Sequence, residues 1–180
     1  MRVVQQRLGR GEGVEGALFA GVARCMQLRC GHPLDEQEHL GMGREVSTLF
    51  FIREGPKLPL EEYVQFLVEC MNCSPSVSVA ALVYVDRFCE LTSLRPTEHH
   101  IHKLLLVAMM CAFKFWEDRS GMVVGHVAEC VQLPAREVAS YELLFLMGLQ
   151  FALVITEADL QSKLEELAAD NPTLQASLWS

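Results

Sequence analysis

Ten apolar residues follow one another without a polar break at residues 104–113, near the middle of the chain. A helix of this composition has no polar face, and a helix that is apolar all round is buried in a folded protein. The run is also shorter than the roughly 20 residues that a helix needs to cross a bilayer. We therefore expect a buried central helix that opens at Thr97 and ends before a turn at residues 118–121.

Amphipathic segments flank this central helix on both sides. Leu60, Tyr63 and Leu67 recur with a period near 3.6, which indicates a helix, and Pro and acidic residues mark its start. Thr156 and Asp159 have the spacing of a capping box. The pattern predicts an all-α fold with helices near residues 14–30, 36–53, 58–70, 77–91, 97–117, 122–131, 134–149 and 156–169.

Composition narrows the class of protein. The chain has 180 residues and a formal charge of −8, whereas a nucleic-acid surface needs clustered lysines and arginines. Its seven cysteines are scattered through apolar segments, and no secretory signal stands at the start, which favours the cytoplasm or the nucleus. The lone Cys70-x-x-Cys73 pair lacks the four ligands of a structural zinc site. We expect no nucleic acid, no membrane and no metal.

Lys114 is the unusual residue of the central helix, because it lies between Phe113 and Phe115. Its ammonium group must reach water, an acid or a partner chain, since an unpaired buried charge is unstable. Either the side chain extends to solvent, or the charge is held at a protein interface. Glu142 precedes the apolar run 143–149, so the two charges would meet at the rim if their helices pack side by side. A structural salt bridge would explain such a pair equally well.

Catalytic motifs are missing from the sequence, which has no GxSxG, no HExxH and no phosphate-binding loop. His99 and His102 would share one face of a helix and offer two metal ligands, but no third ligand is obvious nearby. We therefore expect no enzyme, no catalytic residues and no cofactor.

Three segments together resemble a cyclin box: residues 84–88 (YVDRF), residues 112–118 (AFKFWED), and Tyr141-Glu142 followed by residues 149–153 (LQFAL). The resemblance covers roughly residues 36–155 and implies a single five-helix cyclin box with flanking N- and C-terminal helices. Residues 56–63 (PKLPLEEY) and 102–106 (HKLLL) look like the single-box cyclins of the P/U type, best known from fungal phosphate signalling.

The resemblance implies roles for five residues. In cyclins a lysine of the third box helix and a glutamate of the fifth bind backbone groups of the kinase's mobile regulatory helix, and Lys114 and Glu142 match these positions. Phe115, Phe151 and Leu153 match the apolar positions that contact the kinase helix. The implied function is a regulatory subunit that binds and activates a cyclin-dependent protein kinase, in the cell cycle and cell division or in nutrient signalling. The alternative is a cyclin-fold adaptor that binds a non-kinase protein.

The chain also departs from the cell-cycle cyclins. Their Met-Arg-Ala-Ile-Leu docking motif is absent from residues 56–63, which puts the docking of Arg-x-Leu substrates in doubt. In the family, the partner of Asp86 is an arginine of the first box helix, and Lys57 lies at about that place here. No second box fits after Leu153.

These observations divide the chain into an N-terminal extension that could be mobile (1–33), a box with its preceding helix (34–155), and a C-terminal helix and tail (156–180). Leu49, Phe50 and Ile52 are too apolar to stay in water, so we expect the segment 36–53 to pack on the box or on the kinase. Deletion of residues 1–30 is then expected to leave a folded binder, and deletion through Gly55 to harm solubility or affinity.

Overall fold

The computed structural model describes residues 12–31, 48–52, 58–117, 123–169 and 171–179, and the regular secondary structure within these ranges is helical. The all-α fold is therefore confirmed. Apart from a helical turn at residues 48–50, the helices are α2 (Glu12–Leu28), α4 (Leu60–Met71), α5 (Ser76–Thr92), α6 (Ile101–Trp116), α7 (Val123–Cys130), α8 (Ala135–Gly148), α9 (Glu157–Ala168) and α10 (Pro172–Trp179).

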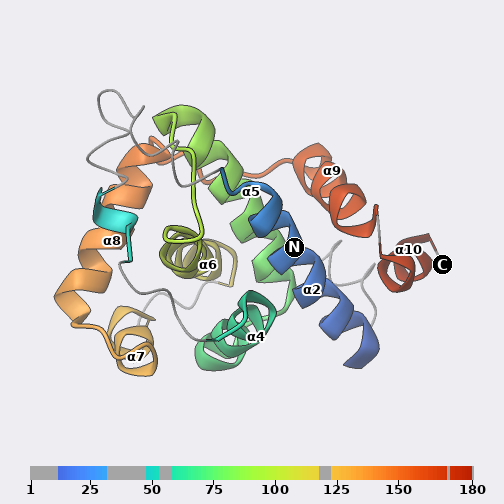
Figure 1. Ribbon diagram of the computed structural model, residues 1–180, viewed down its shortest axis with the longest axis horizontal. Coiled ribbons are helices and arrows are strands. Elements are labelled where there is room, and N and C mark those ends of the chain that lie inside the picture. The colour runs from blue at the N-terminus through green and yellow to red at the C-terminus, as the bar shows by residue number, and fades with distance from the viewer. Residues whose placement is uncertain (1–11, 32–47, 53–57, 118–122, 170, 180) are drawn as a thin grey trace.

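The predicted central helix is α6, which lies in the middle of the molecule and contacts α4, α5, α7 and α8 (Figure 1). All side chains of the apolar run 104–113 are buried. The helix begins at Ile101 and not at Thr97, because residues 98–100 form a turn. The Thr97 carbonyl accepts the backbone N–H of His100 at 2.9 Å, and the ring Nδ1 of His100 accepts the backbone N–H of Thr97 at 3.1 Å.

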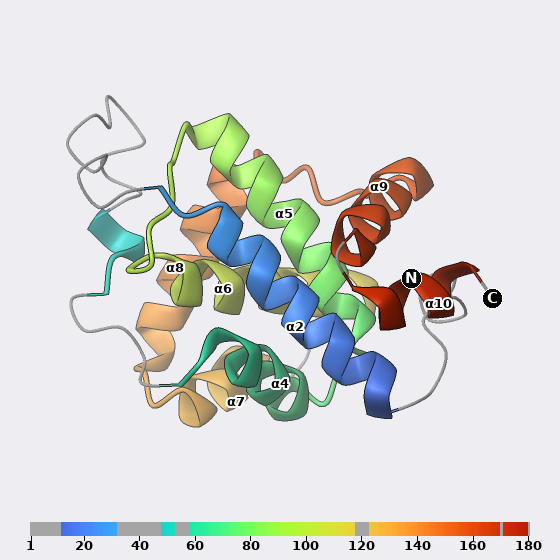
Figure 2. The same cartoon turned by 45° about the vertical axis from the view of Figure 1, so that its right-hand side comes forward.

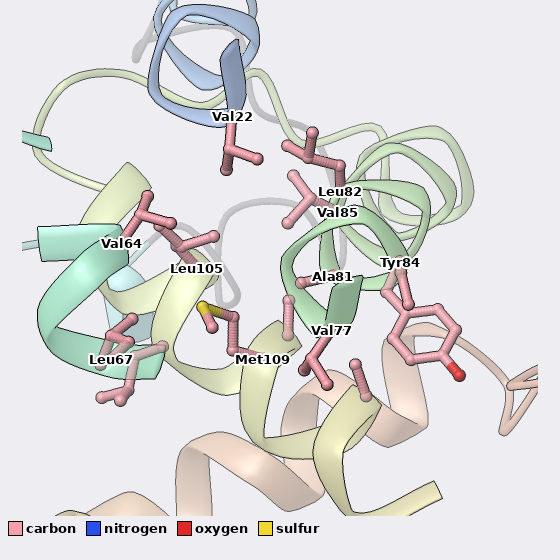
Figure 3. Close-up of a cluster of buried hydrophobic side chains, with 14 of the residues drawn as sticks. Val22, Val64, Leu67, Val77, Ala81, Leu82, Tyr84, Val85, Leu105 and Met109 are labelled. Atoms are coloured by element: carbon pink, nitrogen blue, oxygen red, sulfur yellow. The ribbon is translucent and has the colours of Figure 1, made fainter. Parts of the chain in front are cut away.

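One hydrophobic core joins the helices of this arrangement. Figure 3 shows side chains from four helices meeting there, among them Val22 of α2, Val64 of α4, Ala81 of α5 and Met109 of α6. The paired alanines at residues 80–81 are fully buried on α5, which is in extensive contact with α6. No single described helix is long and apolar enough to span a membrane, although α4 and α5 together meet this test in length and composition with a bend of 115° between them.

The N-terminal extension contains a helix that belongs to the core. Helix α2 runs alongside α5 and α4 and also contacts α9 and α10 (Figure 2). Its buried side chains are Leu18, Phe19, Val22, Ala23, Cys25 and Met26. This packing argues against the expectation that residues 1–30 can be deleted without loss of folding, because their apolar face covers helices of the box.

The segments that flank the box agree in part with the prediction from the sequence. Thr156 and Asp159 form the predicted capping box at the start of α9, and α10 follows where the sequence predicted no definite element. The expected helix at 36–53 lies mostly outside the described residues. Phe50 is fully buried, with its ring centroid 5.7 Å from that of Phe88 and 6.4 Å from that of Phe145, so this part of the segment does pack on the box.

Candidate protein-interaction site

The structure brings Lys114 and Glu142 together. Lys114 lies in the last turn of α6, Glu142 lies on α8, and the two helices pack against each other. The Lys114 ammonium donates to both carboxylate oxygens of Glu142, with Nζ–Oε1 2.6 Å and Nζ–Oε2 2.8 Å. The two side chains are 24% and 14% exposed, so the pair lies at the rim of the core with an open side.

This ion pair retains hydrogen-bonding capacity. An ammonium group has three donors, and within the described residues the Lys114 ammonium uses two of them, both on Glu142. Each carboxylate oxygen of Glu142 can accept a further hydrogen bond. The pair can therefore donate to a carbonyl group and accept from an N–H group of a second molecule without being broken.

Large apolar side chains are exposed around the same helix ends. Phe115 follows Lys114 and is 44% exposed, and Phe151, just after α8, is 61% exposed. Leu143 and Met147, one turn apart on α8, and Val154 are exposed as well. The apolar run 143–149 is therefore buried only in part. Exposed apolar groups beside a charge pair are typical of a protein-binding surface.

The backbone that carries Phe151 is fixed by hydrogen bonds. The Phe151 N–H donates to the Leu146 carbonyl and the Gln150 N–H donates to the Met147 carbonyl, each at 2.9 Å. This is the hydrogen-bond pattern of a Schellman motif. Gln150 and Phe151 have φ angles of 52° and 57°, in the left-handed region that side chains other than glycine rarely adopt. The motif thus closes α8 and holds Phe151 outward.

Tyr84 of α5 fixes the backbone at Leu153, two residues after Phe151. The hydroxyl of Tyr84, which points away from the core cluster in Figure 3, donates to the Leu153 carbonyl at 2.6 Å. Trp116 Nε1 donates to the same hydroxyl at 3.0 Å. Burial raises the pKa of Tyr84, which keeps its phenol a donor. Leu153 itself is half-buried against the core, in contrast to the exposed Phe151.

Arg87, also on α5, fixes the backbone on either side of Leu153. Its guanidinium donates to the carbonyl of Ala152 and, at 3.1 Å, to that of Val154, and it lies 3.7 Å from the Asp159 carboxylate. The sequence singles out the YVDRF segment but does not show what Tyr84 and Arg87 contact. Their carbonyl acceptors lie 69 and 65 to 67 residues away in the chain, which a local pattern does not reveal.

Within the described residues, Asp86 has partners that the sequence did not indicate. Asp86 accepts from Arg29, at the end of α2, and from Lys163 of α9, and Arg29 also donates to Glu166 at 2.9 Å. Burial raises the pKa of Asp86, but hydrogen bonds from Arg29 and Lys163 outweigh burial and hold the pKa below its usual value. Lys57 lies outside the described residues. The cluster of Arg29, Asp86, Lys163 and Glu166 therefore ties α2 and α9 to α5.

The two histidines considered as metal ligands are not arranged for that purpose. His99 precedes α6, and its Nδ1 is 3.0 Å from the Ile52 carbonyl oxygen. The His102 ring is buried against Tyr63, with 5.0 Å between ring centroids. A cavity of about 620 Å³ opens beside it between α4, α6 and α7, lined largely by apolar side chains that include Tyr63, Phe66 and Leu106.

Comparison with known proteins places these features in a family. The family model described as cyclin matches residues 31–153, which include α4 to α8 and the Lys114–Glu142 pair. Cyclin-U4-1 of Arabidopsis thaliana is 34% identical over 102 residues, covering 56% of this chain and 50% of the relative. Cyclin-U2-1 of the same plant is 32% identical over 111 residues, covering 60% and 49%.

A rice protein matches over a shorter range. Cyclin-P3-1 of Oryza sativa subsp. japonica is 31% identical over 75 residues, covering 42% of this chain and 32% of the relative. The chain thus spans about half the length, or less, of these curated relatives. Because the family model matches more than half of the chain and includes its core helices, the chain belongs to the cyclin family.

Proposed function

We propose that this cyclin binds and activates a cyclin-dependent protein kinase, and that Lys114, Glu142, Phe115, Phe151 and Leu153 form the kinase-binding face. The observation that carries the proposal is the Lys114–Glu142 pair, which keeps free hydrogen-bonding capacity while Phe115, next to Lys114 in the chain, and Phe151, just after the helix of Glu142, are exposed. A structural salt bridge would not need exposed aromatic neighbours.

The physical basis of the proposal is that the ends of a docked helix need hydrogen-bond partners. The ends of a helix carry backbone N–H and C=O groups that have no partner within the helix. The Lys114 ammonium offers donors and the Glu142 carboxylate offers acceptors for such groups. Phe115 and Phe151 would exclude water around them, which strengthens each of these hydrogen bonds.

Activation is then a shift in population. The protein performs no chemistry and binds the active arrangement of the kinase's regulatory helix better than the inactive one. A preference of about 10⁴ is sufficient to convert a kinase from almost entirely inactive to almost entirely active. Fixed supports for Phe151 and Leu153 favour this mechanism, because a rigid face discriminates between two helix positions better than a mobile one.

Two finer predictions belong to this proposal. The relatives described above are plant U- and P-type cyclins, so a role in phosphate signalling of the fungal kind rests on the motif likeness alone. A location in the cytoplasm or nucleus follows from the nature of a kinase partner and from the seven cysteines, all of which are free.

The test begins with affinity capture on the purified chain, with mass spectrometry of what binds. The captured kinase is then produced alone and assayed with and without the chain, with Phe151→Asp as the surface variant and Gln161→Asp, on α9, as the matched control. We expect stimulation by the wild type and by the control, and little by Phe151→Asp. Equal stimulation by all three would contradict the proposed face, and phosphate transfer by the chain alone would contradict the proposed function. Capture of a non-kinase protein through the same face, without any kinase, would favour the adaptor.

A further inference from the structure

A cluster of sulfur and imidazole ligands lies at the contact between α4 and α7, away from the Lys114–Glu142 pair. Cys70 is in the last turn of α4, and His126 and Cys130 are one turn apart on α7. Their ligand atoms all lie within 4.8 Å of one another. The sulfur of Cys130 is 3.8 Å from Nε2 of His126. Cys70 and Cys130 are half-buried and His126 is exposed.

The separation between the Cys130 sulfur and the His126 nitrogen is close to that around a shared metal ion. Zinc binds cysteine sulfur at about 2.3 Å and histidine nitrogen at about 2.0–2.1 Å in a tetrahedral site. Such a site places two sulfurs about 3.8 Å apart and a sulfur and a nitrogen about 3.6 Å apart. The observed 3.8 Å between Cys130 and His126 needs little adjustment to meet this geometry.

We propose that Cys70, His126 and Cys130 form a binding site for a zinc ion, which would join the end of α4 to α7. Two thiolates and one imidazole form a set of donors that binds zinc better than it binds harder cations. Water would occupy the fourth position on the solvent side, because His126 is exposed. This inference is independent of the proposed kinase partner.

Binding requires two local changes. The two thiols lose their protons to become zinc ligands. Nε2 of His126, which now donates to the backbone carbonyl oxygen of Cys70 at 2.8 Å, turns from that carbonyl to the ion, and the ring proton moves to Nδ1. Cys73, the other member of the Cys-x-x-Cys pair, is buried, and within the described residues it is not part of the cluster. The sequence analysis expected no metal at the Cys70-x-x-Cys73 pair, and the proposed site departs from that expectation because the fold brings His126 and Cys130 of another helix to Cys70.

The alternative is a polar contact that only closes the α4–α7 junction, or a pair of cysteines that forms a disulfide bond on oxidation. Zinc titration of the reduced, full-length chain in the presence of a competing chelator distinguishes these. Cobalt(II) as a second probe reports thiolate ligation through its charge-transfer absorption, which scales with the number of thiolates. Cys70→Ser, Cys130→Ser and His126→Gln remove one ligand each, and Cys30→Ser and His99→Gln serve as matched controls outside the cluster.

We expect one zinc ion per wild-type chain and a higher melting temperature with zinc. Each ligand variant should lose at least about a hundredfold in zinc affinity, because a large share of a zinc site's binding energy is removed with each ligand. The charge-transfer band should fall to about half in each cysteine variant, and the controls should bind as the wild type does. The proposal is overturned if the reduced wild type binds no zinc, or if folded ligand variants bind it as tightly as the controls. A Cys70–Cys130 disulfide in a chain that binds no zinc when reduced would overturn it equally.

Discussion

Two charge clusters of this protein are alike in geometry and differ in surroundings. Asp86 is enclosed by cations from two other helices, Arg29 of α2 and Lys163 of α9, and Glu166 completes that group. Lys114 and Glu142 instead pair only with each other within the described residues, next to exposed aromatic rings. The first cluster joins three helices, and the second leaves hydrogen-bonding groups available.

The difference shows that the N–O distance of an ion pair does not indicate whether the pair stabilises the fold or binds a partner. Both clusters have short N–O separations and both are partly shielded from water. What separates them is the number of helices that each cluster connects and the apolar area exposed beside it. We therefore assign stability to the Asp86 cluster and binding to the Lys114–Glu142 pair, and the predictions below test that division.

Deletion of residues 1–30 should have the largest effect, on folding. Four large buried side chains, Leu18, Phe19, Val22 and Met26, leave the core with α2, and Arg29 leaves Asp86. At about 1.5–3 kcal/mol for each side chain, the loss is about 6–12 kcal/mol, comparable to the entire stability of a domain. The measurement is chemical denaturation followed by circular dichroism, and we expect no cooperative transition.

Point variants of α2 separate this effect from the truncation itself. Met26→Ala should lower the free energy of unfolding by about 2–5 kcal/mol, because its side chain is fully buried. Gln27→Ala, on the exposed face of the same helix, should change it by less than about 0.5 kcal/mol. A truncated chain that unfolds at the same denaturant concentration as the full chain would contradict the assignment of α2 to the core.

Gly148→Ala should disturb the packing of α8 on α5, which supports the proposed binding face. A Cβ atom at this position would lie 2.3 Å from Cε2 of Phe88 and 3.1 Å from Cγ2 of Thr92. The Phe88 ring cannot yield freely, since it is fully buried and stacked on Phe145 with 4.6 Å between centroids. We expect a loss of about 1–3 kcal/mol in unfolding free energy, measured by urea titration, with Gly125→Ala as control at a position where the added atom meets nothing. Equal denaturation midpoints for the two variants would show that the α5–α8 contact is looser than described.

Phe151→Ala should act on binding and hardly on folding. The ring is 61% exposed, so its removal should change the free energy of unfolding by less than about 0.5 kcal/mol. If the ring is an anchor of the interface, the same change should weaken kinase binding by more than about 1 kcal/mol, or at least fivefold in affinity. Calorimetric titration against the kinase checks the affinity, and Leu91→Ala, an exposed apolar residue at the end of α5, is the control. Equal losses in both variants would mean that Phe151 has no special place in the interface.

The smallest predicted effect is on the stability of the fold at acidic pH. The pKa of Asp86 is lower in the folded chain than its usual value, and the pKa of Glu166 is lowered as well by Lys163 and Arg29 despite burial. Such carboxylates stabilise the fold at pH values above their unfolded pKa of about 4, and this contribution is lost as the pH falls through the folded pKa. Unfolding measured between neutral pH and about pH 3 should show a decline below about pH 4 that is shallower in Asp86→Asn. An identical decline in both proteins would remove Asp86 from this role.

Much of this architecture could be predicted from local sequence patterns. The apolar run 104–113 identified the central helix, and the spacing of Thr156 and Asp159 identified the start of α9. The pairing of Lys114 with Glu142 can be predicted because each charge borders an apolar run and the two charges are opposite. These features depend on neighbours within a few residues or on one helix–helix contact.

The rest depends on long-range contacts that no local pattern contains. Asp86 lies 57 residues from Arg29 and 77 from Lys163, so a local pattern does not indicate these partners. The exposure of Leu143 and Met147 depends on which helices α8 packs against. In that case the excess of apolar residues was itself a signal, because it exceeds what one helix face can bury.

The most direct test compares Glu142→Ala with Asp86→Ala in two measurements, thermal or chemical unfolding and titration with the kinase. We predict that Glu142→Ala lowers affinity by about 2–5 kcal/mol, or roughly 30-fold to several thousand-fold, and that it lowers the unfolding free energy less than Asp86→Ala does, because one cation loses its partner and not two. Lys114→Ala should behave alike, and the double variant should be strongly non-additive. Asp86→Ala should lower the unfolding free energy by about 2–3 kcal/mol, because Arg29 and Lys163 lose one of the two carboxylates that they share and keep only Glu166, and should leave the affinity per folded molecule unchanged. If Glu142→Ala lowers stability while affinity per folded molecule stays the same, the pair is a structural salt bridge and the proposed binding face is wrong.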